Sequence, residues 1–259
     1  MSHIKNRFFI LRSINFGLLV IFLTAISFVF VDLPFFKFTR TMSGYIFWFF
    51  ENVIDLISDI FDPFNITIIS IIFLANIFSI KKTLKIPSKK KLIKSKFSTT
   101  VESLNETLTY YNLVFYHIIV SILFSGLICH ILKYIIGAAR PKYFFLEGFE
   151  RLDNFNLFHK ANALPSGHTQ AAFTIVMLLI IYINKYKLIF LFIAFLIGLS
   201  RIFLSMHFLS DIILGAYVGL VGPMITYIFF FKDKFEPINF GKVLKPKVFF
   251  KLLCYKFYI

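Results

Sequence analysis

The chain has 259 residues, of which 58% are hydrophobic and 20% aromatic, and its formal net charge is +15. Soluble domains are about half apolar, so a soluble fold of this length could not cover so much apolar surface. The positive charge does not indicate a nucleic-acid partner, because the basic residues cluster between apolar runs and no nucleic-acid-binding motif accompanies them. Composition therefore predicts an all-α, polytopic membrane helix bundle.

The first apolar run covers residues 13–31 and follows a basic N-terminal segment. Ala25 and Ser27 loosely fit the small-residue pattern of a signal-peptide cleavage site. The apolar character continues beyond them, which favours an uncleaved first span. Whether this segment is cleaved stays open at the level of sequence.

The segment from 32 to 65 is less uniformly apolar than a membrane span. Glu51, Asp55 and Asp59 recur at every fourth residue, so on a helix they form one acidic stripe. Apolar residues cover the rest of the helix surface. This pattern predicts an amphipathic helix at the membrane interface, between the first two spans, and assigns no chemistry to it.

Five further apolar runs complete a bundle of about six transmembrane helices. They cover residues 66–80, 111–132, 168–183, 188–204 and 211–231. The N-terminus, the lysine-rich segment 81–96, the link 184–187 and the tail then fall on one side of the membrane. These are the basic segments, so that side is predicted to be the cytoplasm. The expected organisation is a single membrane domain over 1–259, with a catalytic core at 111–231 and a basic cytoplasmic tail at 232–259.

Polar residues interrupt the apolar pattern between the fifth and sixth runs. His207 and Asp211 are four residues apart, so a continuous helix would place them on one face. A carboxylate there can fix one imidazole nitrogen as N–H and leave the other free to attack an electrophile. Arg201 is a permanent cation whose planar fork of donors suits a phosphate. The alternative is a polar helix end solvated at the membrane surface.

Two further segments favour the functional interpretation. Lys133 lies seven residues before Arg140-Pro141, and Pro165-Ser166-Gly167-His168 precedes the fourth predicted span. The three segments read K-x6-R-P, P-S-G-H and S-R-x5-H-x3-D. Together they resemble the signature of the type-2 phosphatidic acid phosphatase family, with every fixed position matched in order. The resemblance covers residues 111–231.

Phosphoryl transfer requires charge stabilisation around the equatorial oxygens of the phosphoryl group. Candidate phosphate-binding groups are the side chains of Lys133, Arg140, Arg201 and Ser166 and the backbone amide of Gly167. Spacing alone does not separate the roles of the two histidines. The resemblance implies that His207, oriented by Asp211, is the nucleophile and that His168 is the general acid and base. It also implies that the reaction needs no metal and no cofactor.

The family resemblance implies a phosphatase that acts on a membrane lipid phosphate. The predicted topology independently places the signature residues on the outer side of the membrane. The plausible substrates are undecaprenyl pyrophosphate, the phosphates of lipid A, phosphatidylglycerophosphate and phosphatidic acid, with lipid A phosphate or undecaprenyl pyrophosphate preferred. A lipid phosphotransferase would use the same residues. A non-catalytic lipid-phosphate binder or transporter is the alternative from another class. The oligomeric state is not predicted.

We expect several notable residues outside the signature to serve the structure of the bundle and not the chemistry. His117 and His130 lie in or near the third predicted span and are expected to be satisfied bundle histidines. Gly215 and Gly219 form a small-xxx-small pattern in the last span, which allows close helix approach. We expect this pattern to serve packing within the bundle and not a dimer contact.

Overall fold

The computed structural model describes residues 10–156, 158–183 and 185–255. Within these ranges the chain is helical with no β-strand, apart from an isolated bridge between Ala138 and Leu152. The chain divides into two compact units, and each is considered by itself. Several of the basic residues used in the topology prediction, Lys5, Arg7 and Lys256, lie outside the described residues.

The first unit comprises Ile66–Val120 and Tyr227–Ile259. Its elements are most of α6 (Pro63–Thr83), α7 (Pro87–Lys96), the first part of α8 (Val101–Ile136), η4 (Tyr227–Phe231), α13 (Lys232–Phe235), η5 (Phe240–Lys242) and α14 (Pro246–Tyr255). Phe249 of α14 is fully buried and stacks on Tyr111 at 3.8 Å between ring centroids. The region predicted as a basic tail therefore contributes an amphipathic helix to a packed core.

The second unit comprises Ser2–Asn65 and Ser121–Thr226. Its N-terminal elements are α2 (Ile14–Ile26), η1 (Ser27–Val31), α3 (Asp32–Thr39), α4 (Gly44–Phe49), η2 (Phe50–Ile54) and α5 (Asp55–Ile60). The remaining elements are the last part of α8, α9 (Pro141–Glu147), η3 (His159–Ala161), α10 (Gly167–Tyr182), α11 (Lys187–Phe203) and α12 (Leu209–Thr226). All eight residues predicted to form the site lie in this unit.

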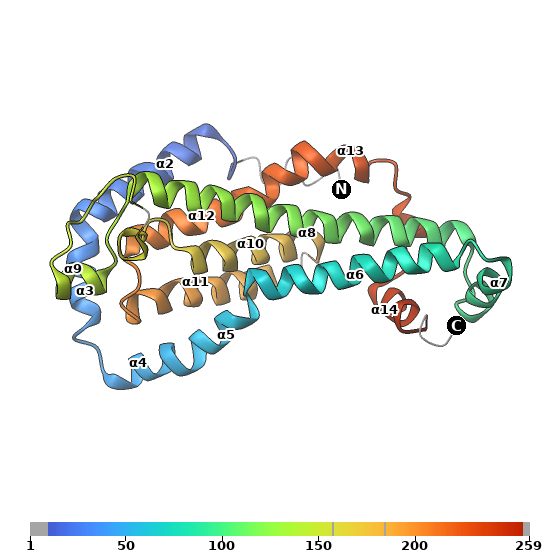
Figure 1. Ribbon diagram of the computed structural model, residues 1–259, viewed down its shortest axis with the longest axis horizontal. Coiled ribbons are helices and arrows are strands. Elements are labelled where there is room, and N and C mark those ends of the chain that lie inside the picture. The colour runs from blue at the N-terminus through green and yellow to red at the C-terminus, as the bar shows by residue number, and fades with distance from the viewer. Residues whose placement is uncertain (1–9, 157, 184, 256–259) are drawn as a thin grey trace. The chain divides into compact units, whose positions relative to one another are not determined.

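Helix α10 is the centre of the second unit, since most of its side chains are buried and it packs against both α11 and α12 (Figure 1). Two glycines of α12 make this close approach possible. A Cβ on Gly215 would lie 2.7 Å from the Ser166 carbonyl oxygen, and one on Gly219 would lie 2.4 Å from the Gln170 carbonyl oxygen. The prediction that this glycine pair serves packing within the bundle is confirmed.

The described residues contain four helical stretches long and apolar enough to cross a membrane. These are Ile14–Thr39, Gly44–Thr83, Val101–Ile136 and Leu209–Phe235, and α10 is a shorter apolar helix. The predicted all-helical membrane bundle is thus confirmed, whereas six spans and an interfacial helix stay predictions. The segment predicted as interfacial continues into the second predicted span with only a short turn at Phe61 and Asp62.

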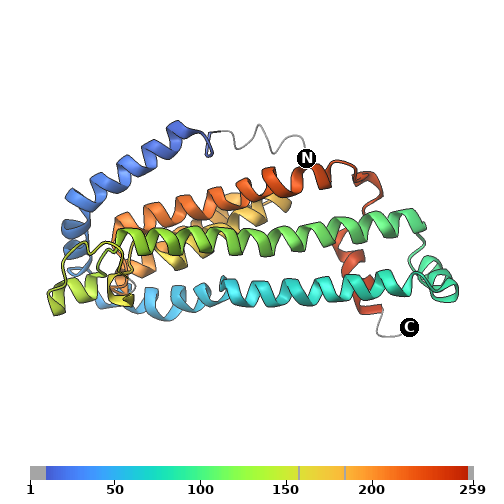
Figure 2. The same cartoon turned by 45° about the horizontal axis from the view of Figure 1, so that its top comes forward.

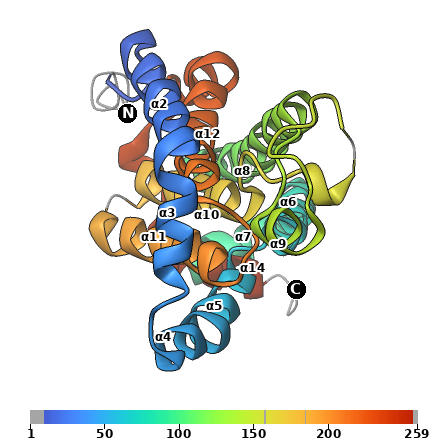
Figure 3. The same cartoon turned by 90° about the vertical axis from the view of Figure 1, so that its left-hand side faces the viewer.

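Because the helices of the second unit run in alternating directions, the ends of four of them lie together (Figure 2). Helix α8 ends at Ile136, α10 begins at Gly167, α11 ends at Phe203 and α12 begins at Leu209. Helix α3 crosses this end of the unit and contacts α11 and α12 (Figure 3). Residues far apart in the sequence therefore meet at one end of the bundle.

The glycine packing can be tested by the substitution Gly219→Ala. The added methyl group would overlap the backbone of α10, so we expect a loss of about 1–3 kcal/mol of stability. Gly126→Ala is the matched control, because a Cβ there meets nothing within 4 Å and alanine favours a helix. Thermal unfolding of the purified variants in detergent gives the melting temperature of each. Equal melting temperatures for the two variants would contradict the packing argument.

Candidate functional site

The buried pair formed by His207 and Asp211 lies where α11 gives way to α12. Their side chains are at most 3% exposed, and His207 Nδ1 lies 3.1 Å from Asp211 Oδ2. The same carboxylate oxygen accepts a hydrogen bond of 2.9 Å from the backbone N–H of Phe208, as the third residue of a capped helix does. With Nδ1 bonded to the carboxylate, Nε2 is the nitrogen left for chemistry.

Asp32 is a second carboxylate at the start of α12. Its Oδ1 accepts a 2.9 Å hydrogen bond from the Ser210 backbone N–H, and its Oδ2 accepts one of 2.6 Å from the Ser210 hydroxyl. Ser27 also donates to Oδ1, at 3.1 Å. The first amides of a helix have no acceptor in their own helix and favour negative charge, so Asp32 stabilises the turn that carries His207.

Arg151, from the loop after α9, provides the cation for this buried carboxylate. Its guanidinium pairs with Asp32 and lies over the rings of Phe28 and Phe208, 4.3 and 3.6 Å from their centroids. Burial lowers the pKa of Arg151, and the charge of Asp32 opposes that effect. The ion pair therefore gives each of these two groups an opposite charge beside the His207 turn.

Two of the predicted phosphate-binding cations donate to backbone carbonyls. Lys133 Nζ donates to the Asn162 oxygen at 2.7 Å, and Arg140 Nε donates to the His159 oxygen at 3.1 Å. A carbonyl satisfies a donor without neutralising its charge, so both cations remain available to an anion. The nearby Arg140 charge lowers the pKa of His159, with smaller contributions from burial and from Lys133.

Arg201 has a different partner. Its guanidinium forms an ion pair with Asp55 of α5 and donates from Nε to the Ser200 hydroxyl at 3.0 Å. A hydroxyl of the same short helix, Ser58, lies 3.4 Å from Arg201 Nη2. Segment 32–65, to which the sequence assigned no chemistry, supplies Asp55 to Arg201 and Asp32 to the first turn of α12.

The predicted cations converge on His207. Its pKa lies well below 6.5, chiefly because the side chain is buried. Charged neighbours lower it further: Lys133, Arg140, His168 and Arg201. The imidazole is therefore neutral near pH 7, the state that a nucleophile requires.

The start of α10 supplies the remaining predicted residues. Ser166 caps this helix, since its hydroxyl oxygen accepts from the Thr169 backbone N–H at 3.4 Å. The Thr169 hydroxyl also donates to it at 2.9 Å, and the Ser166 backbone N–H donates to the Asp211 carbonyl at 2.9 Å. The following amides, of Gly167 and His168, have no acceptor in their own helix. A Cβ on Gly167 would come no closer than 3.9 Å to Lys133 Cε, so the backbone here is open to approach.

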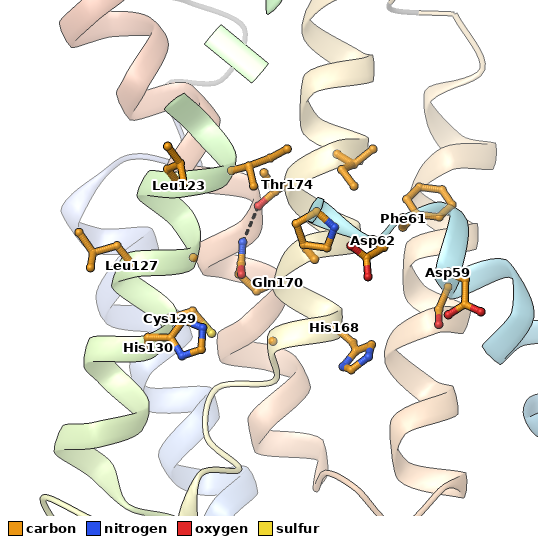
Figure 4. A pocket seen from close by; sticks show the side chains of 17 residues that line it. Asp59, Phe61, Asp62, Leu123, Leu127, Cys129, His130, His168, Gln170 and Thr174 are labelled. Atoms are coloured by element: carbon orange, nitrogen blue, oxygen red, sulfur yellow. Dashed lines mark hydrogen bonds between the residues drawn. The ribbon is translucent and has the colours of Figure 1, made fainter. Parts of the chain in front are cut away.

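Residues including Gly167 and His168 line a cavity of about 500 Å³, and Figure 4 shows His168 among its lining side chains. Its wall is largely apolar and comes from α8, α10 and the turn between α5 and α6. Four other titratable side chains line it: Asp59, Asp62, Cys129 and His130. The prediction that His130 is a satisfied bundle histidine was wrong, because this side chain is exposed to the cavity. A residue on a helix can face either a neighbour or a cavity, and spacing does not distinguish them.

These features define a helical membrane protein with a buried histidine–aspartate pair ringed by cations. The model of the PAP2 superfamily matches residues 115–235, a range that includes all eight predicted site residues. The match covers a little under half of the chain, and over this range the chain is similar to the PAP2 superfamily.

Curated relatives support the same family. A lipid A 1-phosphatase of Rhizobium johnstonii is 29% identical over 42% of this chain and 45% of the relative. The bacitracin transport permease protein BcrC of Bacillus licheniformis is 30% identical over 39% of this chain and 49% of its own. Lipid phosphate phosphatase 2 of Arabidopsis thaliana is 26% identical over 52% of this chain and 55% of its own length. The chain thus spans about half the length of these relatives. No solved structure gives a significant match.

The structure brings the predicted residues together, and their individual roles stay predictions. It adds Asp32, Asp55 and Arg151, which lie outside the signature. A carboxylate at the end of an apolar run, as Asp32 is, was a signal of a site in the sequence. Its partner Arg151 had no such signal in the sequence, because an arginine in a polar loop is most often exposed to solvent.

We expect the imidazole of His207 to resist protonation. Because its pKa is lowered, the group stays neutral as the pH falls through 6.5 and gains a proton only in more acidic solution. Histidine NMR spectra of the detergent-solubilised protein can follow this, with the His207 signal assigned by its loss in His207→Gln. Titration of that signal at or above pH 6.5 would contradict the buried geometry.

We expect Asp32→Asn to reduce turnover by about 10- to 100-fold while changing KM little. The amide still accepts from Ser210, but Arg151 loses its counter-charge beside the His207 turn. The rate is to be measured per folded protein, after size-exclusion chromatography. Glu102→Gln removes an exposed carboxylate of an ion pair elsewhere and is the control. Unchanged turnover in folded Asp32→Asn protein would exclude a positioning role.

Proposed function

We propose that the protein is a lipid phosphate phosphatase that hydrolyses a phosphate monoester or diphosphate of a membrane lipid. The observation that carries the proposal is the buried contact of 3.1 Å between His207 Nδ1 and Asp211, with three cations around the same imidazole. The match of residues 115–235 to the PAP2 superfamily and the names of the relatives support it.

In the first step, the neutral His207 attacks the phosphorus atom through Nε2. The new N–P bond forms as the bond from phosphorus to the lipid oxygen breaks, and His168 gives a proton to that oxygen. Asp211 stabilises the positive charge that develops on the His207 ring. The products are a phosphohistidine and the dephosphorylated lipid.

In the second step, a water molecule attacks the phosphohistidine. His168, now deprotonated, accepts a proton from this water while the N–P bond breaks and inorganic phosphate leaves. The phosphoryl oxygens are held in both steps by Lys133, Arg140 and Arg201 together with Ser166 and the Gly167 amide. Lys133 and Arg140 are held by backbone carbonyls and Arg201 by Asp55 and Ser200, so little reorganisation is required during the reaction.

The apolar cavity beside His168 suits a substrate with a hydrocarbon chain. A lipid whose phosphate reaches the cations would leave its chain next to the wall formed by α8 and α10. Of the expected substrates, lipid A phosphate and undecaprenyl pyrophosphate remain preferred. The Rhizobium relative's name supports the first.

The proposed setting is a cytoplasmic membrane, with both chain ends in the cytoplasm and the site on the outer, periplasmic side. The basic segments between the apolar runs support this orientation. A substrate would then enter from the outer leaflet.

The decisive experiment compares wild-type protein with His207→Ala on a panel of lipid phosphates. We expect phosphate release to fall by at least about 10⁴-fold, because no nucleophile remains. Brief reaction with a ³²P-labelled lipid, followed by alkaline quenching, should label the wild type and not the variant. Asp32, Asp211 and the cations stay in place, so binding of the lipid should persist.

The same assay separates the alternatives. A lipid phosphotransferase would give a labelled lipid or sugar product in place of free phosphate. A binder or transporter would keep its function in His207→Ala. Activity in EDTA tests whether the reaction is metal-independent, and loss of turnover there would contradict the mechanism.

A further inference from the structure

A second cavity of about 610 Å³ adjoins the proposed site, and we call it the rim pocket. It is formed by α3, α9 and the segment that follows α11. Its lining residues are Phe36, Lys37, Arg40, Pro141, Lys142, Phe145, Leu146, Leu204 and Ser205. Three of these are cations and none is acidic, which gives the pocket a positive charge over an apolar floor.

Arg40 is fixed in this pocket by the end of α11. Its Nη2 donates to the Ile202 oxygen at 2.6 Å, and its Nη1 donates to the Phe203 oxygen at 3.0 Å. The last carbonyls of a helix have no donor in their own helix, so Arg40 acts as a cap. Its guanidinium also lies 4.4 Å from the centroid of the Phe36 ring. None of these contacts neutralises the charge.

Lys37 and Lys142 are exposed at the rim pocket. Among the described residues, neither forms an ion pair with a carboxylate, whereas the nearby Lys160 pairs with Glu147. Exposed lysines beside a membrane attract anionic groups with about 1 kcal/mol each. The pocket therefore has the cations to bind an anion, and its own lining contains no carboxylate that would occupy them.

The rim pocket is continuous with the proposed catalytic residues along two chain segments. Pro141 directly follows Arg140, and Ser205 precedes His207 by two residues. The two segments touch, since the Lys142 backbone N–H donates to the Ser205 oxygen at 3.2 Å. Arg140 Nη1 also lies 3.7 Å from Met206 Sδ. A headgroup whose phosphate sits on Arg140 therefore extends naturally towards the rim pocket.

We propose that the rim pocket binds a second anionic group, next to the phosphate that is removed. This inference rests on the proposed function and specifies its substrate class: lipids with at least two anionic headgroup groups, or a phosphate lipid with an anionic neighbour. In both cases the pocket's cations bind an anionic group. Lys37 and Lys142 bind this group, and Arg40 supports them with a fixed charge.

The test uses full-length protein in phosphatidylcholine vesicles and two substrates, phosphatidylglycerophosphate and phosphatidic acid. We expect wild-type kcat/KM to be about tenfold higher for the first, which carries the extra anionic group. The double variant K37Q/K142Q should lose this preference and keep its activity on phosphatidic acid within twofold. Lys187→Gln, at the far end of α11, removes an exposed charge away from the pocket and should behave as wild type.

A second arm identifies the source of the anion. Phosphatidic acid is assayed in vesicles with and without phosphatidylglycerol. Stimulation by phosphatidylglycerol that disappears in K37Q/K142Q supports the rim pocket with a neighbouring lipid as ligand. The proposal is overturned if the wild type responds to neither extra anion, if the double variant keeps its preference, or if Lys187→Gln causes the same loss.

Failure of the proposed function gives a different result. If wild-type protein hydrolyses none of the lipid phosphates, the catalytic proposal fails, and the pocket is tested by binding alone. Fluorescently labelled phosphatidylglycerophosphate should then bind wild-type protein about tenfold more tightly than K37Q/K142Q. Equal affinity would overturn the rim pocket. Salt should weaken the wild-type binding more than that of the variant.

Discussion

The site depends on a pair of carboxylates buried at the start of one helix. Asp32 and Asp211 both accept hydrogen bonds from the first turn of α12 or the residue before it, where backbone amides have no other acceptor. That arrangement satisfies the amides and gives the acids donors inside an apolar bundle. His207 is held by the same turn, so the capping of a helix also fixes the orientation of the proposed nucleophile.

The cations around His207 are arranged so that an anion can still use them. Lys133 and Arg140 donate to carbonyl oxygens, which hold their side chains without cancelling their charge. Arg201 alone among these three pairs with a carboxylate, that of Asp55, and its Nε donates to the Ser200 hydroxyl. Enzymes that transfer phosphoryl groups stabilise the transition state mainly through preorganised positive charge of this kind.

Two cavities with different surfaces adjoin this charged centre. One is lined in part by His168 and is largely apolar, as a hydrocarbon chain requires. The other has a basic lining beside Arg140 and Ser205, as an anionic headgroup requires. The proposed chemistry at phosphorus uses residues of the signature, whereas the rim pocket is formed by residues outside it.

The sequence by itself determined the helical membrane architecture, because long apolar runs admit few other folds, and it identified eight candidate residues through a signature with fixed spacing. It also anticipated the packing of Gly215 and Gly219, since a small-residue pattern has a local geometric meaning. Only the tertiary structure joined Asp32 to Arg151 and Asp55 to Arg201, because ion pairs between distant segments leave no periodic trace. It alone also decided that His130 faces a cavity and that Lys37, Arg40 and Lys142 share one, since which face of a helix is covered depends on its neighbours.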